Sequence, residues 1–169
     1  MAMPRTLKNF NLFNDGNSYM GQVEEVTLPK LTRKMEEYRG GGMIGAVQLD
    51  MGQEKVELEW KCAGFMRGVL EQYGAIKIDG VPLRFAGAYQ RDDTAAVDAV
   101  EIVVRGRHVE IDPGSAKVGE KTEFAVKTAA AYYKLSVNGS TVIELDFVNG
   151  IEVVNGTDLY ADIRAAIGL

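Results

Sequence analysis

The stretch Val56-Glu57-Leu58-Glu59-Trp60-Lys61-Cys62 alternates apolar and charged side chains without a break. Successive side chains of an extended strand point to opposite faces, so Val56, Leu58, Trp60 and Cys62 share one face. Glu57, Glu59 and Lys61 share the other face, which meets water or a polar lumen. The segment therefore predicts a half-buried β-strand, and the same period elsewhere in the chain predicts a mainly β fold.

A second long strand is expected across residues 97–112, with an interruption. Val100, Ile102 and Val104 share one face, but Val109 and Ile111 have the opposite parity. Gly106 lies between the two sets, so we expect a bulge or bend at this glycine.

Asn-Gly pairs recur in the C-terminal third of the chain. Asn138-Gly139 separates two alternating apolar runs and favours a type I′ hairpin turn, in which both central residues have positive φ. Asn149-Gly150 and Asn155-Gly156 repeat this signal. Residues 124–154 are therefore predicted to form strands in a meander.

Helical spacing occurs in two short segments. Residues 65–73 carry apolar groups at four-residue steps, and Leu159, Ile163 and Ile167 do the same after Thr157 or Asp158 as the expected N-cap. Together with about seven or eight strands, they predict a single domain over residues 1–169, an antiparallel β-barrel or sandwich with one or two short α-helices.

Composition excludes several classes of protein. The 169 residues carry a net charge of −5, with one cysteine and one histidine, which excludes a disulfide framework and a multi-cysteine zinc site. No metal or cofactor is expected. The sequence pI near 5.0 argues against specific nucleic-acid recognition, which needs clustered Lys and Arg. The start lacks an apolar run of signal-peptide length and no window suits a spanning helix, so we expect the protein in the cytoplasm of the producing cell.

Four features that could suggest chemistry have simpler explanations. Gly40-Gly41-Gly42 lacks the Lys-Ser/Thr of a phosphate-binding loop, and Asp92-Asp93 lacks calcium-loop spacing and fits a solvated turn. His108 has no nucleophile placed by motif, so we expect a surface or interface histidine. Cys62 ends an apolar row and is expected to be a buried thiol. No catalytic residue is predicted.

Residues 30–52 do not fit a self-contained monomer. Charged and apolar residues alternate up to Arg39, a glycine run follows, and the next residues are apolar with little charge. We expect an extended, glycine-hinged arm at about 38–52 that another subunit covers. Its expected contact residues are Gly40, Gly41, Gly42, Met43, Ile44, Val47, Leu49 and Met51.

Several motifs resemble one known family along the whole chain. They are the opening Met-Ala-Met-Pro-Arg, the stretch from Val26 through Thr32-Arg33-Lys34 to Gly40, the block Arg84-Phe85-Ala86-Gly87-Ala88-Tyr89-Gln90-Arg91-Asp92-Asp93, and the ending Ile167-Gly168-Leu169. Together they resemble the major tail tube protein of contractile-tailed phages. Within that family the chain looks most like the tube subunit of R-type pyocins, which are phage-tail-like bacteriocins.

The resemblance implies hexameric rings that stack into a hollow tube inside a contractile sheath, with strands closing across subunits into one continuous β-barrel. It implies the arm as a contact between rings, and no catalytic residues. Implied partners are other copies, the sheath protein, a baseplate or spike hub, a tail terminator, a tape-measure protein and the target cell envelope. The implied particle assembles in the cytoplasm, leaves by lysis, and drives a rigid conduit through an envelope, with ion leakage and membrane depolarisation.

Alternatives to the pyocin tube are the tail tube of a DNA-delivering phage or prophage and a secreted tube subunit of a contractile secretion system. A monomeric β-barrel that binds a small ligand is a further alternative, and an enzyme ranks last. Six subunits of −5 would give a ring near −30. We expect some of Glu57, Glu59, Asp98, Glu101 and Glu123 to line the bore. Glu71 and Gln72, on a short surface helix, are candidates for sheath contact.

Overall fold

The computed structural model describes residues 1–169 and consists mostly of antiparallel strands. In chain order the elements are β1 (Arg5–Asn14), β2 (Asn17–Ser18), β3 (Val23–Thr27), β4 (Arg33–Tyr38), β5 (Val47–Gln53), β6 (Glu57–Cys62), α1 (Arg67–Gln72), β7 (Val81–Arg91), β8 (Val97–Asp112), β9 (Phe124–Val137), β10 (Ser140–Asp146), β11 (Ile151–Val154), β12 (Thr157–Asp158) and α2 (Ala161–Ala166). The strands outnumber the prediction because β2 and β12 have only two residues each and the arm itself is paired.

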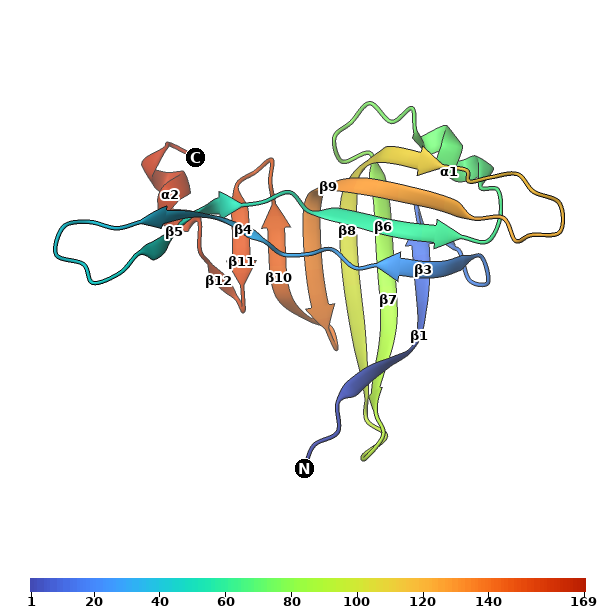
Figure 1. The fold of residues 1–169 in the computed structure, drawn as a ribbon, viewed down its shortest axis with the longest axis horizontal. Coiled ribbons are helices and arrows are strands. Elements are labelled where there is room, and N and C mark those ends of the chain that lie inside the picture. Colours follow the sequence, from blue (N-terminus) through green and yellow to red (C-terminus); the bar gives the residue numbers. More distant parts are fainter.

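The strands form two layers whose directions cross (Figure 1). One, which we call the β7 layer, has the order β12-β11-β10-β9-β8-β7-β1-β2. The other, which we call the β6 layer, consists of β3, β6, residues 124–129 of β9 and residues 107–112 of β8. β8 and β9 belong to both layers because they are long and bend from one into the other. The single chain is therefore an open sandwich and not a closed barrel.

The predicted interruption lies at and just after Gly106, and the parity of β8 itself changes at Val109, since Val104, Gly106 and His108 all face inward. The β8–β9 register shifts between Arg105 and Gly106 and again between His108 and Glu110. Bulges of this kind turn a strand and increase its twist. Only glycine fits at position 106, because a Cβ there would lie 1.7 Å from the carbonyl oxygen of Ala129.

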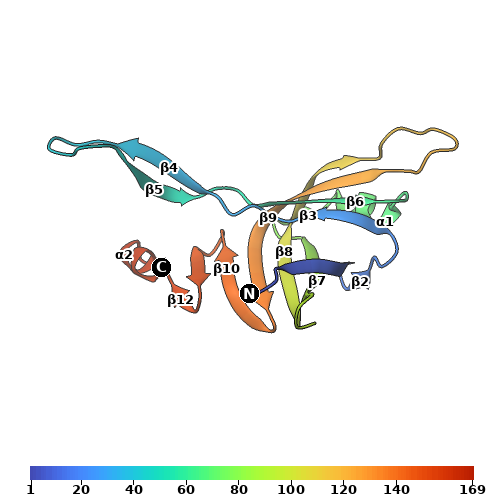
Figure 2. The same cartoon turned by 60° about the horizontal axis from the view of Figure 1, so that its bottom comes forward.

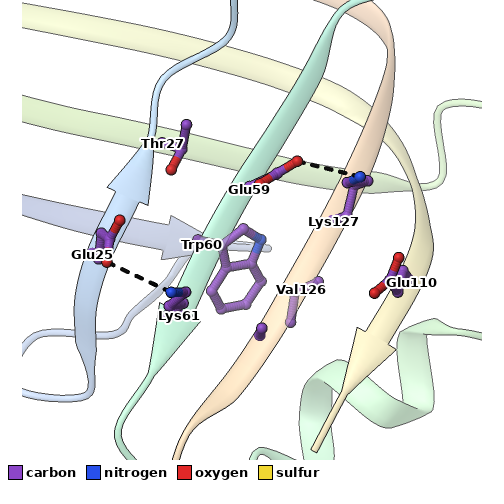
Figure 3. A pocket seen from close by; sticks show the side chains of 9 residues that line it. Glu25, Thr27, Glu59, Trp60, Lys61, Glu110, Val126 and Lys127 are labelled. Carbon is purple, nitrogen blue, oxygen red and sulfur yellow. Dashed lines mark ion pairs between the residues drawn. The ribbon is translucent and has the colours of Figure 1, made fainter. Parts of the chain in front are cut away.

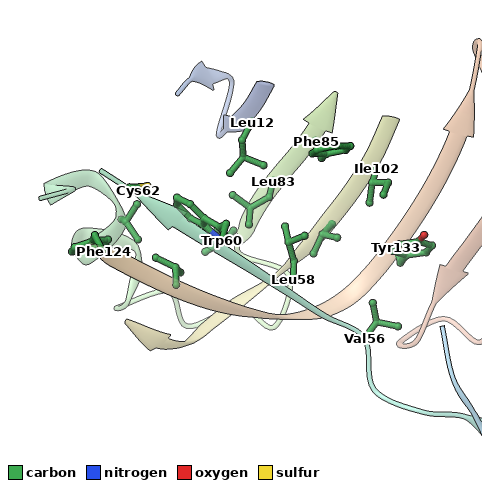
Figure 4. Packing of buried hydrophobic residues seen from close by; sticks show 14 of the residues in the cluster. Leu12, Val56, Leu58, Trp60, Cys62, Leu83, Phe85, Ile102, Phe124 and Tyr133 are labelled. Atoms are coloured by element: carbon green, nitrogen blue, oxygen red, sulfur yellow. The ribbon is translucent and has the colours of Figure 1, made fainter. Parts of the chain in front are cut away.

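The core lies between the layers (Figure 4). Leu58 and Trp60 of β6 are 1 % exposed and pack with Leu12, Leu83 and Phe85 of the β7 layer. Cys62 is also fully buried. The alternation that predicted the fold is thus confirmed, since the charged residues between these positions point away from the core.

The predicted hairpin turns are confirmed at two of the three Asn-Gly pairs. Asn138 and Gly139 have φ of 50° and 82° between β9 and β10, and Asn155-Gly156 repeats this geometry between β11 and β12. At Asn149-Gly150 only the glycine has positive φ.

Both predicted helices form, but the N-cap prediction for the second was wrong. Thr157 and Asp158 pair with β11 as β12, and α2 starts later, after Tyr160. The Asp158 carboxylate instead accepts a hydrogen bond from the Tyr160 backbone N–H at 3.0 Å and pairs with Arg164 at 2.5 Å.

The arm is a separate two-stranded sheet formed by β4 and β5. It projects from one end of the molecule, whereas the β8–β9 connection projects from the other (Figure 2). The N-terminus and α2 belong to the β7-layer side of the fold (Figures 1 and 2).

Candidate assembly interface

Both side edges of the β6 layer lack a partner strand. β3 pairs only with β6, and residues 107–112 of β8 pair only with β9 because the β7 pairing stops at Gly106. Unpaired backbone groups along an edge can bond to a strand of another chain. The β7 layer also has a free edge along β1, but its other side ends in the two-residue β12 followed by α2. The β6 layer is therefore the one that a neighbouring copy can extend on both sides.

The strand directions of the β6 layer suit a repeating array. β3, β6, β9 and β8 are antiparallel in succession, so the two edge strands run in opposite directions. If a rotated copy places its β3 beside this β8, the new pair is again antiparallel. An even number of strands in each copy therefore allows a ring to close with the same pairing throughout.

The outer face of the β6 layer is charged and more acidic than basic. Lys127 lies 3.3 Å from Glu59, which raises the lysine's pKa through that hydrogen bond, and Lys61 lies 3.9 Å from Glu25 (Figure 3). By register and alternation, the ionisable residues on this face are Glu25, Glu57, Glu59, Glu110, Asp112, Lys61, Lys127 and Arg107. Five carboxylates thus face three cations.

The structure brings together only two of the five acidic residues predicted for the bore. Glu57 and Glu59 share the outer face of β6, but Asp98 and Glu101 lie in the part of β8 that belongs to the β7 layer. Asp98 pairs with Arg5, and Glu101 lies 3.2 Å from Arg84. Glu123 lies in the connection before β9. Sequence reasoning missed Glu25 and Glu110, whose place beside Glu59 follows only from strand register.

One face of the arm is apolar except for Glu36. Tyr38 lies opposite Val47, and Glu36 lies opposite Leu49, so these four side chains share a face, and Met51 follows Leu49 at the same spacing. Val47, Leu49 and Met51 are about half exposed, and their strand β5 has no extensive contact with any element other than β4. Tyr38, which was not predicted, joins the predicted residues through its cross-strand position.

The tip of the arm contains the predicted glycines with Met43 and Ile44. The Gly40 backbone N–H donates to the Met43 sulfur at 3.1 Å, so Met43 folds onto the tip. Ile44 is fully exposed. The Tyr38 hydroxyl would lie 2.8 Å from a Cβ at Gly40, so the tyrosine side chain packs over this glycine.

The two candidate sheath residues have different surroundings. Glu71 is exposed on α1 and pairs with Arg67 at 2.8 Å. The Gln72 amide points inward and exchanges two hydrogen bonds of 2.7 Å with the amide of Asn14. Only Glu71 is therefore free to meet a partner.

The expectation of a surface or interface His108 was wrong, because the side chain is 5 % exposed. Its Nδ1 lies 2.9 Å from the Thr128 hydroxyl and its Nε2 lies 3.0 Å from Gln72 Oε1. His108 keeps the inward parity of Ile102, Val104 and Gly106, because the bulge in β8 comes only after it, at Val109.

The remaining features carry no chemistry. Asp92 and Asp93 lie in the β7–β8 turn, as predicted, with Asp93 paired to Arg91 at 2.6 Å. No group of three or more His, Cys, Asp or Glu side chains is arranged to hold a metal ion. None of the helices has the length and apolar character needed to cross a bilayer.

Comparisons with known sequences decide the family. The family model described as phage tail tube protein FII matches residues 4–168. The chain is 49% identical to the tail tube protein of Escherichia phage P2, over the full length of both. It is 40% identical to the major tail tube protein of Serratia phage KSP20, over 100% of this chain and 99% of that protein. The chain belongs to the phage tail tube protein family.

Solved structures agree with this tail tube fold. A chain of the sheath–tube complex of the extracellular contractile injection system PVC matches with a TM-score of 0.58 at 10% identity, covering 79% of this chain and 91% of that chain. The tube-terminating cap of the anti-feeding prophage matches with a TM-score of 0.60 at 12% identity, covering 80% and 93%. As a tail tube protein, the chain is a structural subunit of a contractile tail and not an enzyme.

Proposed function

We propose that this tail tube protein closes into hexameric rings by pairing β3 of each copy with residues 107–112 of β8 in the next. The observation that carries the proposal is the pair of free, oppositely directed edges on one layer. The rings stack into a hollow tube, and one solved neighbour comes from a baseplate described as 6-fold symmetrised. Ring closure satisfies the edge backbone groups that a single copy leaves unpaired.

The outer face of the β6 layer would then line the bore. Its excess of carboxylates, with Glu57 and Glu59 at the centre, makes that bore acidic. An acidic bore repels a phosphate backbone and favours cations. Glu71 stays a candidate for contact with the sheath because it lies on the exposed side of α1.

The arm at about 38–52 would join one ring to the next. Its unpartnered apolar face and exposed Ile44 support this role, since another copy would remove them from water. Partners beyond other copies are a sheath, a terminator and a baseplate or spike hub, and structurally similar chains come from a sheath–tube complex, a sheath/tube terminator and a baseplate. A tape-measure protein inside the growing tube completes the proposed assembly.

In the completed particle, sheath contraction would drive the tube through a target envelope. An R-type pyocin tube, assembled in the cytoplasm and released by lysis, would let ions leak and depolarise the membrane. The phage relatives favour a second candidate, the tail tube of a DNA-delivering phage or prophage. The presence or absence of capsid genes beside this gene distinguishes the two.

Hydrogen exchange tests the proposed pairing of β3 with β8 of the next copy. Free subunits are compared with tubes, both purified by size exclusion. Outward-facing amides of residues 23–27 and 107–112 should gain protection in the tube, whereas the free edge of β1 serves as an internal control. Unprotected β3 and β8 edges in tubes that are intact by negative-stain microscopy would refute the ring model.

Charged substitutions on the arm test whether the arm joins one ring to the next. Met43→Asp, Ile44→Asp and Leu49→Asp together should leave a folded subunit that does not extend a tube. Gln48→Asp, on the opposite face, is the matched control and should assemble. Normal tubes from the triple variant would contradict the assignment.

A further inference from the structure

The β6 layer has a second distinctive end, opposite the arm. Three connections meet there, residues 19–22, 63–66 and 113–123, which we call the loop end. The Ala63 backbone N–H donates to the Gln22 carbonyl at 2.8 Å, the Phe65 ring lies edge-on to Phe124 at 5.8 Å, and Lys121 pairs with Glu24 at 2.5 Å. Figures 1 and 2 both show this end and the arm at opposite ends of the long axis.

Each of the three connections exposes one large apolar side chain. Met20 is 81% exposed, Phe65 is 68% exposed and Val118 is fully exposed. Such a group of apolar side chains at one end of a molecule is typical of a contact surface.

The arm and the loop end differ from each other and lie at the two ends of the same strands. A repeating contact between two unlike patches is head to tail, and it builds an open stack when each copy is displaced along the axis that joins them. The strands of the β6 layer run along that axis in both views. A copy displaced along the strands therefore brings its arm to the loop end of the next.

One charge at each end has a possible partner at the other end. Arg39 follows β4 at the base of the arm's tip and has no ion pair within the chain, and Glu123 at the loop end has none either. Glu24 and Glu120 beside the loop end already pair with Lys121 and Lys117, whereas Asp112 at the end of β8 accepts a hydrogen bond only from the Gly114 backbone N–H. Glu123 is thus the exposed carboxylate of the 113–123 connection that has no ion pair, and Asp112 at the end of β8 is a second one beside it.

We propose that the loop end, formed by Met20, Phe65 and Val118, is the surface that receives the apolar face of the arm from a copy in the next ring, with Arg39 facing Glu123. The inference rests on the proposed function and specifies the partner of the arm. It assigns Glu123 to stacking and leaves the bore to the β6-layer carboxylates. Val118 and Ile44, fully exposed in the single chain, become buried in the stack.

A cysteine pair tests the contact in assembled tubes. Ile44→Cys with Val118→Cys, treated with a short bis-maleimide, should give a covalent ladder that continues past the hexamer, because each link joins two rings. The native Cys62 is fully buried and should not react. Gln48→Cys with Val118→Cys places the thiol on the other face of the arm and should link at least about tenfold less.

Two results of this experiment would overturn the proposal. A ladder that stops at the hexamer would place the contact within a ring, and absence of linking in normal tubes would place the arm elsewhere. If the unmodified chain formed no tubes at all, the proposed function itself would fail, so the two failures are distinguishable.

A charge exchange gives an independent test if the cysteines prevent assembly. Arg39→Glu and Glu123→Arg should each shorten tubes, and the double variant should restore most of the length. Normal tubes from both single variants, or a double variant no better than the singles, would overturn the pairing.

Discussion

Nε2 of His108 in β8 lies 3.0 Å from Oε1 of Gln72, which joins the bend of the sandwich to α1 through the interior. The Thr128 hydroxyl lies 2.9 Å from Nδ1, and Asn14 and Gln72 satisfy each other's amides. The network is complete for a neutral imidazole that donates from Nε2 and accepts at Nδ1. A second proton on the ring, at Nδ1, would make the Thr128 hydroxyl turn and accept, and would place a charge in the core with no anion beside it.

Acid should therefore destabilise the subunit through His108. Burial lowers the pKa of His108 from 6.5 to about 4. The unfolded chain takes up the proton near 6.5 but the folded chain only near 4, so stability is intact above pH 6.5 and falls as the pH drops toward 4. The full loss is about 3 kcal/mol, and urea unfolding of free subunits across this range measures it.

His108→Gln is the control for this pH dependence. It should lower the free energy of unfolding at neutral pH, because the network is altered. It should also lose less stability than the wild type between about pH 6.5 and 4, since no imidazole titrates. An equal acid-induced loss in both proteins would contradict the prediction.

Gly106→Ala should unfold or nearly unfold the subunit. The new methyl group would lie 1.7 Å from a backbone oxygen and 2.7 Å from a backbone carbon of Ala129, neither of which can move without breaking the β8–β9 pairing. We expect a loss of more than about 3 kcal/mol, at or beyond the upper range for overpacking.

Gly45→Ala is the matched control for this substitution, because nothing lies within 4 Å of its Cβ position and its φ is not in the left-handed region. Thermal unfolding should show a change below about 1 kcal/mol for this variant. Near-native stability of Gly106→Ala would show that the bend does not depend on close backbone approach.

The bend near Gly106 and the surroundings of His108 show what the sequence could and could not predict. The alternation around Trp60, the parity change after Gly106 and the Asn138-Gly139 turn depend on a few adjacent residues, so the pattern alone predicts them. The surroundings of His108 depend on Asn14, Gln72 and Thr128, which are far apart in the chain and carry no local signal.

The acidic residues predicted for the bore show the same limit of local sequence patterns. The alternation placed Glu57, Glu59 and Glu101 correctly on the side of their strands away from the core. It could not assign them to a layer, because β8 leaves the β7 layer only after the bend at Gly106. Glu101 and Glu59 therefore lie on different layers although their local patterns are alike.

Cys62 should be inert in the folded subunit. It is fully buried, and burial raises the pKa of its thiol to about 12, so almost no thiolate forms at neutral pH. A colorimetric thiol reagent should find no reactive thiol in native protein and one per chain in denaturant. Rapid native labelling would show that β6 opens easily and would contradict the packing of the core.

Reversing charge on β6 should change the ion preference of the tube. Glu57→Lys with Glu59→Lys makes the outer face of the β6 layer basic, so channels formed by complete particles in a planar bilayer should shift their reversal potential toward anion selectivity. Glu101→Lys, on the other layer, is the matched control and should leave it unchanged. Equal effects from both variants would exclude the β6 layer as the bore.

Arg33 should set the angle of the arm. Its guanidinium pairs with Glu152 of β11 and lies 3.3 Å from Asp50 of β5, and the arm strands have no extensive contact with other elements. Arg33→Glu or Glu152→Arg should leave the free energy of unfolding within about 1 kcal/mol but release the arm, so that tubes are few and short in negative stain.

The double variant Arg33→Glu/Glu152→Arg should recover much of the tube length, because the attraction between β4 and β11 is restored with its direction reversed. Recovery would be incomplete, since the carboxylate introduced on β4 would face the carboxylate of Asp50. Arg67→Ala, which breaks an exposed ion pair within α1, controls for the loss of a surface charge. Full-length tubes from Arg33→Glu alone would mean that the contacts between copies, rather than this ion pair, orient the arm.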